Sequence, residues 1–294
     1  MMHLLGQGSR RRGPTGKGYA TGPAGFALRE DGPVEQRQMQ TLTTTDGVDI
    51  SAVHVPDSRG RTDLCLVVVH GFTGNWRQER VERVIGRLAA FGGVMAIDMR
   101  GHGQSGGATT VGDDEIHDVE AAVSWARALG YGAVVTVGFS LGGAVVLREA
   151  ALMADGPGRV DAVVSVSAPA FWYYRGTRVM RLAHWLVETR PGRLVMRARG
   201  TRVSSRMWTE PLPVPPHEAA ALLGEVPLLV VHGDIDHYFP LEHPRAIHES
   251  ARRSGVRTDL WVEAGFRHAE SSISESALDR IGAWARECLP VQGG

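Results

Sequence analysis

Hydrophobic and polar positions alternate in blocks along most of this chain, from about residue 40 onward. Short runs rich in Val, Ile and Leu are typical of buried strands, and the longer stretches between them have the apolar spacing of helices. The runs predict strands at residues 48–55, 64–70, 94–98, 133–139, 160–166, 228–232 and 258–262, and helices at 76–91, 113–129, 141–153, 244–253 and 274–289. Asp113-Asp114-Glu115 is expected in the first turn of its helix, where the dipole favours acids. Strands that alternate with helices predict an α/β fold, a mostly parallel central sheet with helices on both faces.

The alternation is interrupted between two predicted core strands, at residues 169–225. Prolines cluster at 211–216, and a short apolar helix is predicted at 179–187. Because long insertions are usually functional, we expect a helical lid over the carboxyl edge of the sheet. The segment contains nine arginines and four glutamates, with no Lys or Asp. These arginines either face water or rim a pocket that favours an anionic substrate.

The first 38 residues differ in composition from the rest of the chain. They contain eight Gly and three Pro among few apolar side chains. Such a segment buries too little surface to become ordered, so we predict a disordered tail at 1–38 and one α/β domain at 39–294. An arginine run inside the tail is not followed by the apolar stretch of an export signal. Met39 is a second candidate for the first residue of the protein.

Composition narrows the possible functions. Lys plus Arg and Asp plus Glu number 32 each, so no overall charge favours nucleic acid or an anionic membrane. No apolar run approaches the roughly 18 residues of a membrane span. Cys65 and Cys288 offer no disulfide framework, which suits a reducing cytoplasm. The twelve histidines lack metal-ligand spacing, so neither a metal nor another cofactor is expected. We therefore expect a cytoplasmic protein with a small-molecule partner.

The most informative motif is Gly-x-Ser-x-Gly at residues 138–142. It lies between a predicted strand and a predicted helix, which is the arrangement of a nucleophile elbow. The tight turn lifts Ser140 out of the sheet, and the helix N-terminus points backbone N–H groups at the reacting centre. The same pattern recurs at residues 103–107, but no apolar helix follows it. Ser105 is therefore interpreted as a loop residue and Ser140 as the nucleophile.

A serine hydroxyl needs a base that takes its proton and an acid that orients that base. In α/β sheets of this kind, these partners follow later strands in the order Ser, Asp or Glu, His. Two loops qualify, at residues 232–240 and 263–270. The first contains Asp234 and Asp236, and the second contains His268. Other histidines precede the last predicted strand, namely His232, His237, His243 and His248.

Further motifs occur in a consistent order with these loops. His-Gly-Phe-Thr-Gly-Asn at 70–75 and Asp-Met-Arg-Gly-His-Gly at 98–103 precede the serine motif. With them the chain resembles the α/β-hydrolase branch that contains monoacylglycerol lipases, serine aminopeptidases and cinnamoyl esterases, over most of residues 40–290. The resemblance implies that Ser140 is the nucleophile, Asp236 the orienting acid and His268 the general base. Asp236 is preferred to Asp234 because the family pattern His-Gly-x-x-Asp ends on it.

The resemblance also implies an oxyanion hole formed by the backbone N–H groups of Phe72 and Leu141. Each such donor contributes about 3–4 kcal/mol to transition-state stabilisation. Arg100 and His102 resemble scaffold residues of a Gly-rich loop. The family often has Gly after the catalytic histidine, whereas this chain continues with Ala-Glu. Glu270 is left with two interpretations, as a cap of the following helix or as part of the pocket.

Together these observations predict a serine esterase or thioesterase that works through an acyl-enzyme and needs no cofactor. Its partner would be a small acyl ester or thioester. A lipase or a peptidase with the same mechanism is an alternative. Dehalogenase and epoxide hydrolase chemistry is disfavoured because the elbow carries Ser instead of Asp. A ligand-binding protein that kept the fold is the alternative from another class, since a fold does not determine a function.

Overall fold

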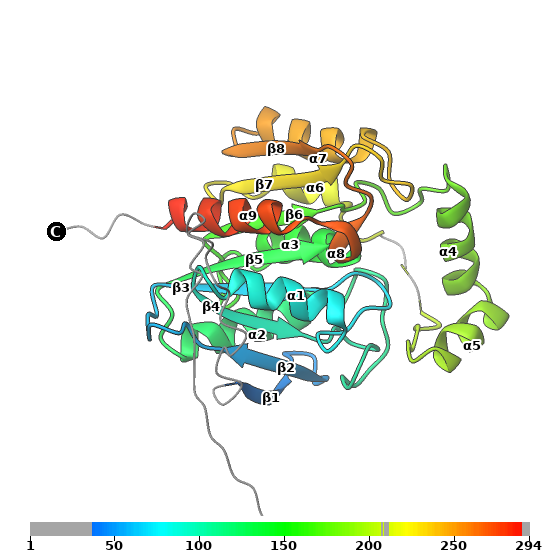
Figure 1. The fold of residues 1–294 in the computed structure, drawn as a ribbon. Coiled ribbons are helices and arrows are strands. Elements are labelled where there is room, and N and C mark those ends of the chain that lie inside the picture. The colour runs from blue at the N-terminus through cyan, green and yellow to red at the C-terminus, as the bar shows by residue number, and fades with distance from the viewer. Residues whose placement is uncertain (1–36, 207, 209–211, 290–294) are drawn as a thin grey trace, which may run out of the picture. The chain divides into compact units, whose positions relative to one another are not determined.

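The computed structural model describes residues 37–206, 208 and 212–289. Of the tail predicted at 1–38, residues 1–36 lie outside them, and Gln38 already belongs to the first strand. In the described residues, eight strands form one sheet in the order β1-β2-β4-β3-β5-β6-β7-β8 (Figure 1). At one side of the sheet, the edge strand β1 (Gln38–Thr43) pairs antiparallel with β2 (Asp49–Val55), which in turn pairs antiparallel with β4. The others are parallel: β4 (Gly93–Ile97), β3 (Leu64–Val69), β5 (Ala133–Phe139), β6 (Ala162–Val166), β7 (Leu228–Gly233) and β8 (Thr258–Glu263). The predicted mostly parallel sheet is confirmed.

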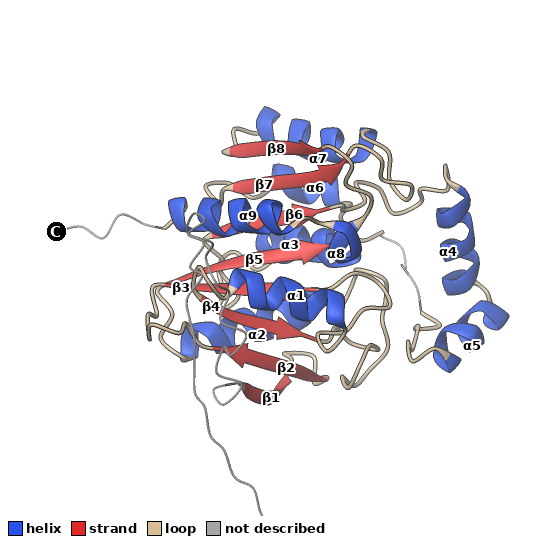
Figure 2. Ribbon diagram, viewed as in Figure 1, coloured by secondary structure: helices blue, strands red, loops and turns tan. Residues whose placement is uncertain are grey.

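Helices cover both faces of this sheet, as predicted (Figure 2). One face packs on α1 (Glu79–Leu88) and α9 (Glu275–Glu287). The other face packs on α2 (Ile116–Ala128), α3 (Leu141–Leu152), α6 (Pro216–Ala221) and α7 (Glu242–Arg253). The two layers explain why the central strands are continuous runs of apolar residues instead of alternating ones.

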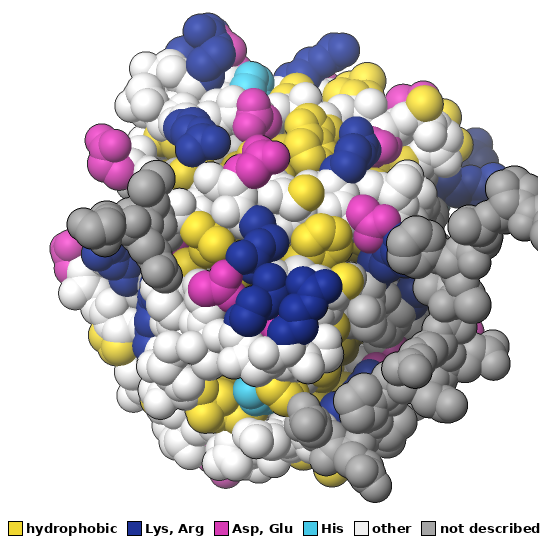
Figure 3. Space-filling model, turned by 60° about the vertical axis from the view of Figure 1, so that its left-hand side comes forward, with side chains coloured by type: hydrophobic (Ala, Val, Ile, Leu, Met, Phe, Trp, Pro, Cys, Tyr) yellow, Lys and Arg dark blue, Asp and Glu magenta, His cyan; other side chains and the backbone are white. Residues whose placement is uncertain are grey.

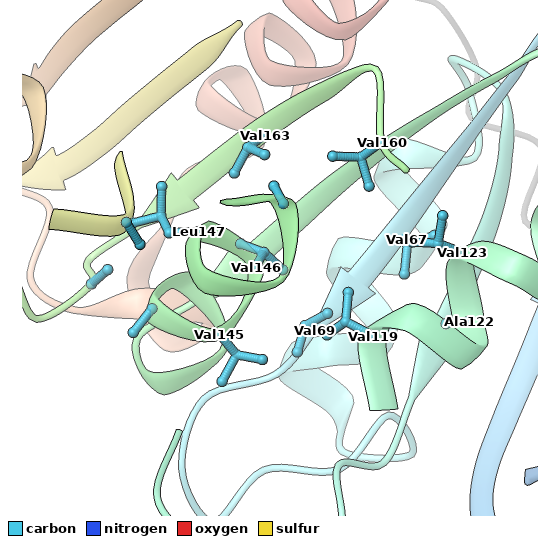
Figure 4. Close-up of a cluster of buried hydrophobic side chains, with 14 of the residues drawn as sticks. Val67, Val69, Val119, Ala122, Val123, Val145, Val146, Leu147, Val160 and Val163 are labelled. Carbon is cyan, nitrogen blue, oxygen red and sulfur yellow. The ribbon is translucent and has the colours of Figure 1, made fainter. Parts of the chain in front are cut away.

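Strand β3 shows how both layers are filled. Its side chains alternate, so that Val67 and Val69 enter one cluster while Leu66 and Val68 enter the other. Figure 4 shows the first of these clusters, with the β3 valines beside Val119 and Val123 of α2 and the valines of α3. Each fully buried side chain of this kind contributes about 1.5–3 kcal/mol relative to exposure. The core therefore holds the parallel strands rigidly, and the carboxyl ends of these strands meet at one edge of the sheet.

Two features differ from the sequence prediction. The short strand β1 was not predicted, because most of its residues are exposed and only Leu42 is buried. The placement of Asp113-Asp114-Glu115 in a first helical turn was wrong, since α2 begins at Ile116. The reason is that the Glu115 carboxylate folds back over the preceding loop and accepts hydrogen bonds from the amides of Thr110 (3.0 Å) and Gly112 (2.9 Å). Asp113 instead pairs with Arg148 of α3 at 3.3 Å.

The long segment between β6 and β7 divides into two parts. Helices α4 (Arg178–Glu188) and α5 (Arg190–Ala198) pack chiefly on each other and lie beyond the carboxyl ends of the parallel strands, at the right of Figure 1. The later helix α6 packs on α3 and α7 and therefore belongs to the helical layer. Residues 207 and 209–211, between the two parts, lie outside the described residues.

The opposite edge of the sheet has a mixed surface. Figure 3 brings the left-hand side of the Figure 1 view forward and shows basic, acidic and hydrophobic side chains interspersed. Ion pairs at 2.5–2.6 Å join loop aspartates at this edge to arginines of loops and helices: Arg61 with Asp57, Arg127 of α2 with Asp161 and Arg286 of α9 with Asp63. Among the helices of the described residues, none is long and apolar enough to cross a membrane.

Candidate active site

Ser140 lies at the junction of β5 and α3 in a strained backbone conformation, with φ +51° and ψ −115°. The glycines on either side leave room for this turn. A Cβ at Gly142 would lie 2.6 Å from the His70 carbonyl oxygen, and one at Gly138 would collide with the carbonyl oxygen of Gly142. The Ser140 amide donates to the Val166 carbonyl at 2.8 Å, which holds the turn to β6. Strain of this kind costs about 1–3 kcal/mol and is typical of functional sites.

The hydroxyl of Ser140 begins a line of hydrogen bonds. Its Oγ lies 3.0 Å from Nε2 of His268, whose Nδ1 lies 2.7 Å from Oδ2 of Asp236. A carboxylate only accepts, so Nδ1 carries the proton and Nε2 presents its lone pair to the serine. Asp234 is not part of this line, because its Oδ1 accepts from the Gly265 amide at 2.7 Å. The structure thus brings together the predicted serine, acid and histidine from three loops.

The acid at the end of this line is firmly held. The Asp236 side chain is 1% exposed, and its Oδ1 accepts from the amides of Tyr238 (2.8 Å) and Phe239 (3.1 Å). The Tyr238 ring stacks on the His268 imidazole, with centroids 4.1 Å apart and planes 23° apart. Stacking on one side and a carboxylate on the other leave the imidazole little freedom to rotate. Tyr238 was not singled out from the sequence, although its place two residues after Asp236 could have indicated the contact.

The other histidines near this loop have structural partners. His232 lies behind Asp236, and its Nε2 donates to the Phe239 carbonyl at 2.8 Å. Burial lowers the pKa of His232, so its imidazole is neutral. The Nδ1 of His243 accepts from the Ala170 amide at 3.0 Å. Among the described residues, none of these histidines is hydrogen-bonded to Ser140, nor are His237 and His248.

The loop after β3 packs directly against the serine. A Cβ at Gly71 would lie 3.2 Å from Cβ of Ser140. The carbonyl oxygen of Gly71 accepts from the Gly74 amide at 2.9 Å and lies 2.7 Å from Nδ1 of His70. Nε2 of His70 accepts from the Met99 amide at 3.0 Å, so the proton is on Nδ1 and also points at this carbonyl. Burial lowers the pKa of His70 to about 3, which keeps this donor in place over a wide pH range.

These contacts determine which backbone N–H groups beside Ser140 have no hydrogen-bond acceptor among the described residues. The carbonyl of Gly71 is held on one side of a planar trans peptide, so the N–H of Phe72 points to the opposite side. Leu141 is the first residue of α3, where an amide has no partner within the helix. Within the described part of the chain, neither the Phe72 nor the Leu141 amide has an acceptor. Both N–H groups are therefore available as donors, and both come from segments that adjoin Ser140.

The loop that carries His268 is tied to the end of β6. Ala269 and Ser167 both have left-handed backbones, with φ of +49° and +52°, although neither is glycine. The Ala269 amide donates to Oγ of Ser167 at 3.1 Å, and the Ser167 amide donates to the Val231 carbonyl at 2.9 Å. These bonds offset the backbone strain at both residues. The position of the imidazole is therefore set by the sheet, not by its own loop alone.

The sequence of this chain matches a known protein family. A family model described as serine aminopeptidase, S33, matches residues 60–210. The chain belongs to this family of α/β-hydrolases. No curated protein matches this S33-family chain.

Solved structures resemble this S33-family chain over most of its length. The esterase Pf2001 of Pyrococcus furiosus is 22% identical, with a TM-score of 0.67, over 87% of this chain and 94% of that one. Est1E of Butyrivibrio proteoclasticus, in a structure with bound ferulic acid, is 19% identical, with a TM-score of 0.55, over 84% and 96%. The esterase domain of a Rhodothermus marinus protein is 21% identical, with a TM-score of 0.59, over 86% and 99%. At these identities the likeness shows a shared α/β-hydrolase fold.

The second Gly-x-Ser-x-Gly segment of this S33-family chain has a different place. Ser105 is 2% exposed; its hydroxyl donates to the Asp98 carbonyl and accepts from the Ser51 amide at 2.8 Å. In the same loop, the buried Arg100 pairs with Asp118 at 2.8 Å and with Asp46 at 2.7 Å. Ser105 and Arg100 therefore hold the turn after β4 and do not reach Ser140.

Glu270, for which the sequence left two interpretations, lies in the short helix α8 (Ala269–Ser272). Its side chain does not cap that helix. The residue is 4% exposed, and Oε1 accepts from the Gly71 amide at 2.6 Å. This bond joins the histidine loop to the loop after β3. Nothing in the local sequence indicates a contact between residues so far apart, so sequence reasoning could not have found it.

Aromatic residues of the inserted segment lie near Leu141, since a Cβ at Gly112 would lie 2.6 Å from the Trp172 ring and 3.3 Å from Cδ1 of Leu141. Trp172 packs in the same cluster as Leu141, and its ring lies 5.4 Å from that of Trp208. Tyr173 adds an edge-on contact with Trp208 at 5.0 Å. Several arginines of this segment contact other parts of the protein itself: Arg175 pairs with Glu188 of α4, Arg193 donates to carbonyls of α4, and Arg202 donates to the Gly107 carbonyl. Among the described residues, no group of three or more His, Cys, Asp or Glu is arranged for a metal ion.

Proposed function

We propose that this chain is a serine hydrolase that cleaves a carboxylic ester or thioester through an acyl-enzyme, with Ser140, His268 and Asp236 as its catalytic triad. The observation that carries the proposal is the hydrogen-bonded line from Oγ of Ser140 through His268 to Asp236, with distances of 3.0 and 2.7 Å. These are distances at which a base takes the proton of a nucleophile and an acid orients that base. The esterase neighbours support the choice of an ester or thioester.

In the proposed reaction, Oγ of Ser140 attacks the acyl carbon while its proton passes to Nε2 of His268. Asp236 holds the imidazole in the required tautomer and stabilises the imidazolium. The carbonyl oxygen becomes an oxyanion, to which the amides of Phe72 and Leu141 donate. The tetrahedral intermediate collapses, and His268 gives the proton to the departing alcohol or thiol. Water then attacks the acyl-enzyme by the same route and releases the acid.

The proposal assigns the α4–α5 pair the role of a lid. Its position beyond the carboxyl ends of the strands supports this role, since ligands of open α/β sheets bind at that edge. Trp172, Tyr173 and Trp208 would then form an apolar wall beside Leu141 that accepts the acyl group. Ferulic acid, the molecule bound in the Est1E structure, carries an aromatic acyl group of this kind.

Labelling with a fluorophosphonate tests the proposal directly. We expect one covalent adduct, on Ser140, together with hydrolysis of p-nitrophenyl esters, and neither in Ser140→Ala. A series of p-nitrophenyl esters of graded chain length, aryl esters, acyl thioesters and aminoacyl anilides then identifies the substrate class. Preference for the anilides would favour a peptidase. A folded wild-type protein that neither labels nor hydrolyses any ester would favour the ligand-binding alternative.

A further inference from the structure

Glu270 is a buried carboxylate that the proposed reaction does not use, and it lies among residues that the reaction does use. It is 4% exposed, and its Oε1 accepts from the Gly71 amide at 2.6 Å. Charge-assisted hydrogen bonds of this length are among the stronger ones in proteins. A Cβ at Gly71 would lie 3.5 Å from this oxygen and 3.2 Å from Cβ of Ser140, so all three meet at one point.

The loop that carries Glu270 is rigid. Its carbonyl oxygen accepts from Nη2 of Arg83 in α1 at 2.8 Å. The preceding amides are held as well, with His268 donating to Oγ of Ser272 at 2.7 Å and Ala269 donating to Oγ of Ser167 at 3.1 Å. The same short segment therefore presents an imidazole to Ser140 and a carboxylate to Gly71. Movement of one is coupled to movement of the other.

The Gly71 contact determines which amide can serve the oxyanion. With its N–H occupied by Glu270, Gly71 is not a donor to substrate. Its carbonyl is occupied by His70 and Gly74, so the whole peptide between Gly71 and Phe72 is fixed in orientation. With respect to the described residues, the N–H of Phe72 is left without an acceptor. Without Glu270, a buried N–H would lack an acceptor, and the loop would turn to satisfy it.

We infer that Glu270 is a positioning residue: its carboxylate, through the Gly71 amide, holds the loop that presents the Phe72 N–H to the oxyanion. The inference rests on the proposed function of Ser140 and deepens it. Its role is orientation and not charge, because a negative charge beside a developing oxyanion opposes it unless that charge is engaged elsewhere. An uncharged acceptor of the same shape should therefore serve nearly as well.

The experiment compares kcat and KM of the full-length protein and its variants on the best p-nitrophenyl ester. Glu270→Leu removes the acceptor, and we expect kcat to fall roughly 10- to 100-fold because the displaced donor acts mainly in the transition state. KM should stay within about threefold. Glu270→Gln retains an oxygen at the same place and should keep kcat within about threefold of wild type. Glu275→Leu is the matched control, since this exposed glutamate pairs with Arg87 of α1 at 3.6 Å and has no other ion pair among the described residues; it should match wild type.

Melting curves establish that each variant is folded. If Glu270→Leu does not fold, Glu270→Asp carries the test, because it keeps a carboxylate but withdraws it by about 1.5 Å, one bond length; it should also lower kcat. Wild-type kcat in Glu270→Leu or in Glu270→Asp, or a loss confined to KM, would overturn the inference. So would an equal loss in Glu270→Gln and Glu270→Leu, which would assign the effect to charge. Failure of the proposed function looks different, because the wild-type protein itself would then be inactive towards esters and fluorophosphonate.

Discussion

The chain contains the Gly-x-Ser-x-Gly pattern twice, and the serines of the two copies differ in backbone conformation and in hydrogen bonding. Ser140 stands at the start of a helix, with a left-handed backbone and its hydroxyl on an imidazole. Ser105 lies in the turn after β4, with its hydroxyl buried between the Asp98 carbonyl and the Ser51 amide. One serine is strained and accessible to chemistry, and the other is satisfied and inert. The element that follows the pattern, not the pattern, decides between these outcomes.

The glycines of the two copies also serve different purposes. Gly138 and Gly142 are needed because β5, α3 and the end of β3 come too close for any Cβ. Gly107 is needed chiefly because its φ angle, +63°, lies in the left-handed region, whereas Gly103 combines a φ of +49° with a side-chain obstacle, since a Cβ there would collide with the Asp98 carboxylate. Close approach of backbones builds an elbow, whereas left-handed turns build a loop.

The largest difference should be in activity. Ser140→Ala should lower kcat for ester hydrolysis by about 10⁴-fold or more, because members of a triad act as a unit. Ser105→Ala should keep kcat within about threefold when rates are normalised to folded protein. Steady-state kinetics with purified variants provide the measurement. Comparable losses in the two variants would mean that the second copy takes part in catalysis.

The glycines should differ next. Gly142→Ala places a Cβ 2.6 Å from the His70 carbonyl oxygen and should lower the free energy of unfolding by about 3 kcal/mol. The nearest atoms to the new Cβ in Gly107→Ala are side-chain carbons, Val48 Cγ1 at 3.0 Å and Arg100 Cβ at 3.6 Å, and the substitution should cost about 1–2 kcal/mol for its left-handed backbone. Urea unfolding monitored by circular dichroism measures both. Equal losses would contradict the distinction between crowding and conformation.

The effects of the two serine substitutions on stability should have the opposite order from their effects on activity. Ser105→Ala leaves the Ser51 amide without its acceptor and should cost about 1–3 kcal/mol. Ser140→Ala removes a hydroxyl from a partly exposed site and should change stability by less than about 0.5 kcal/mol. Urea unfolding curves of the two serine variants measure this difference. A Ser140→Ala variant that is the less stable of the two would show that the elbow serine contributes to the fold.

The smallest effect concerns the helix that distinguishes the two copies. Glu149 of α3 is buried and, within the described residues, neither carboxyl oxygen has a hydrogen-bond partner. Burial, with Glu120 nearby, raises the pKa of Glu149 well above its ordinary value. The folded state therefore retains a proton that the unfolded chain releases above about pH 4.3, so stability falls as pH rises toward the folded pKa. Glu149→Gln cannot ionise and should be more stable than wild type at pH 8.

Unfolding in urea at pH 4 and pH 8 measures this difference, which should shrink at the lower pH. The exposed Glu218, replaced by Gln, provides the control and should show no such trend. A constant difference between Glu149→Gln and wild type at both pH values would show that the carboxyl does not titrate as its burial requires.

Much of the sheet could be predicted because its strands are continuous β-branched runs, buried by helices on both faces. The edge strand β1 could not, because an exposed strand lacks that pattern. Parallel strands end at one edge, which is why Ser140 and His268 could be expected in neighbouring loops. Choosing Asp236 over Asp234 needed the family pattern, since both lie in the same loop. The Glu270 contact depends on closure of the whole sheet, and no local spacing encodes it.

The packing of the α4–α5 pair has a consequence for how this protein can change over evolutionary time. The two helices pack chiefly on each other, and they expose Leu182, Trp185 and Leu194. Substitutions on these outer faces leave the sheet and the catalytic loops undisturbed. Mutation can therefore alter the size and charge of this segment, while residues such as Gly142 are constrained by the backbone at the end of β3. New substrate specificities can thus arise through mutation of this segment while the residues around Ser140 stay unchanged.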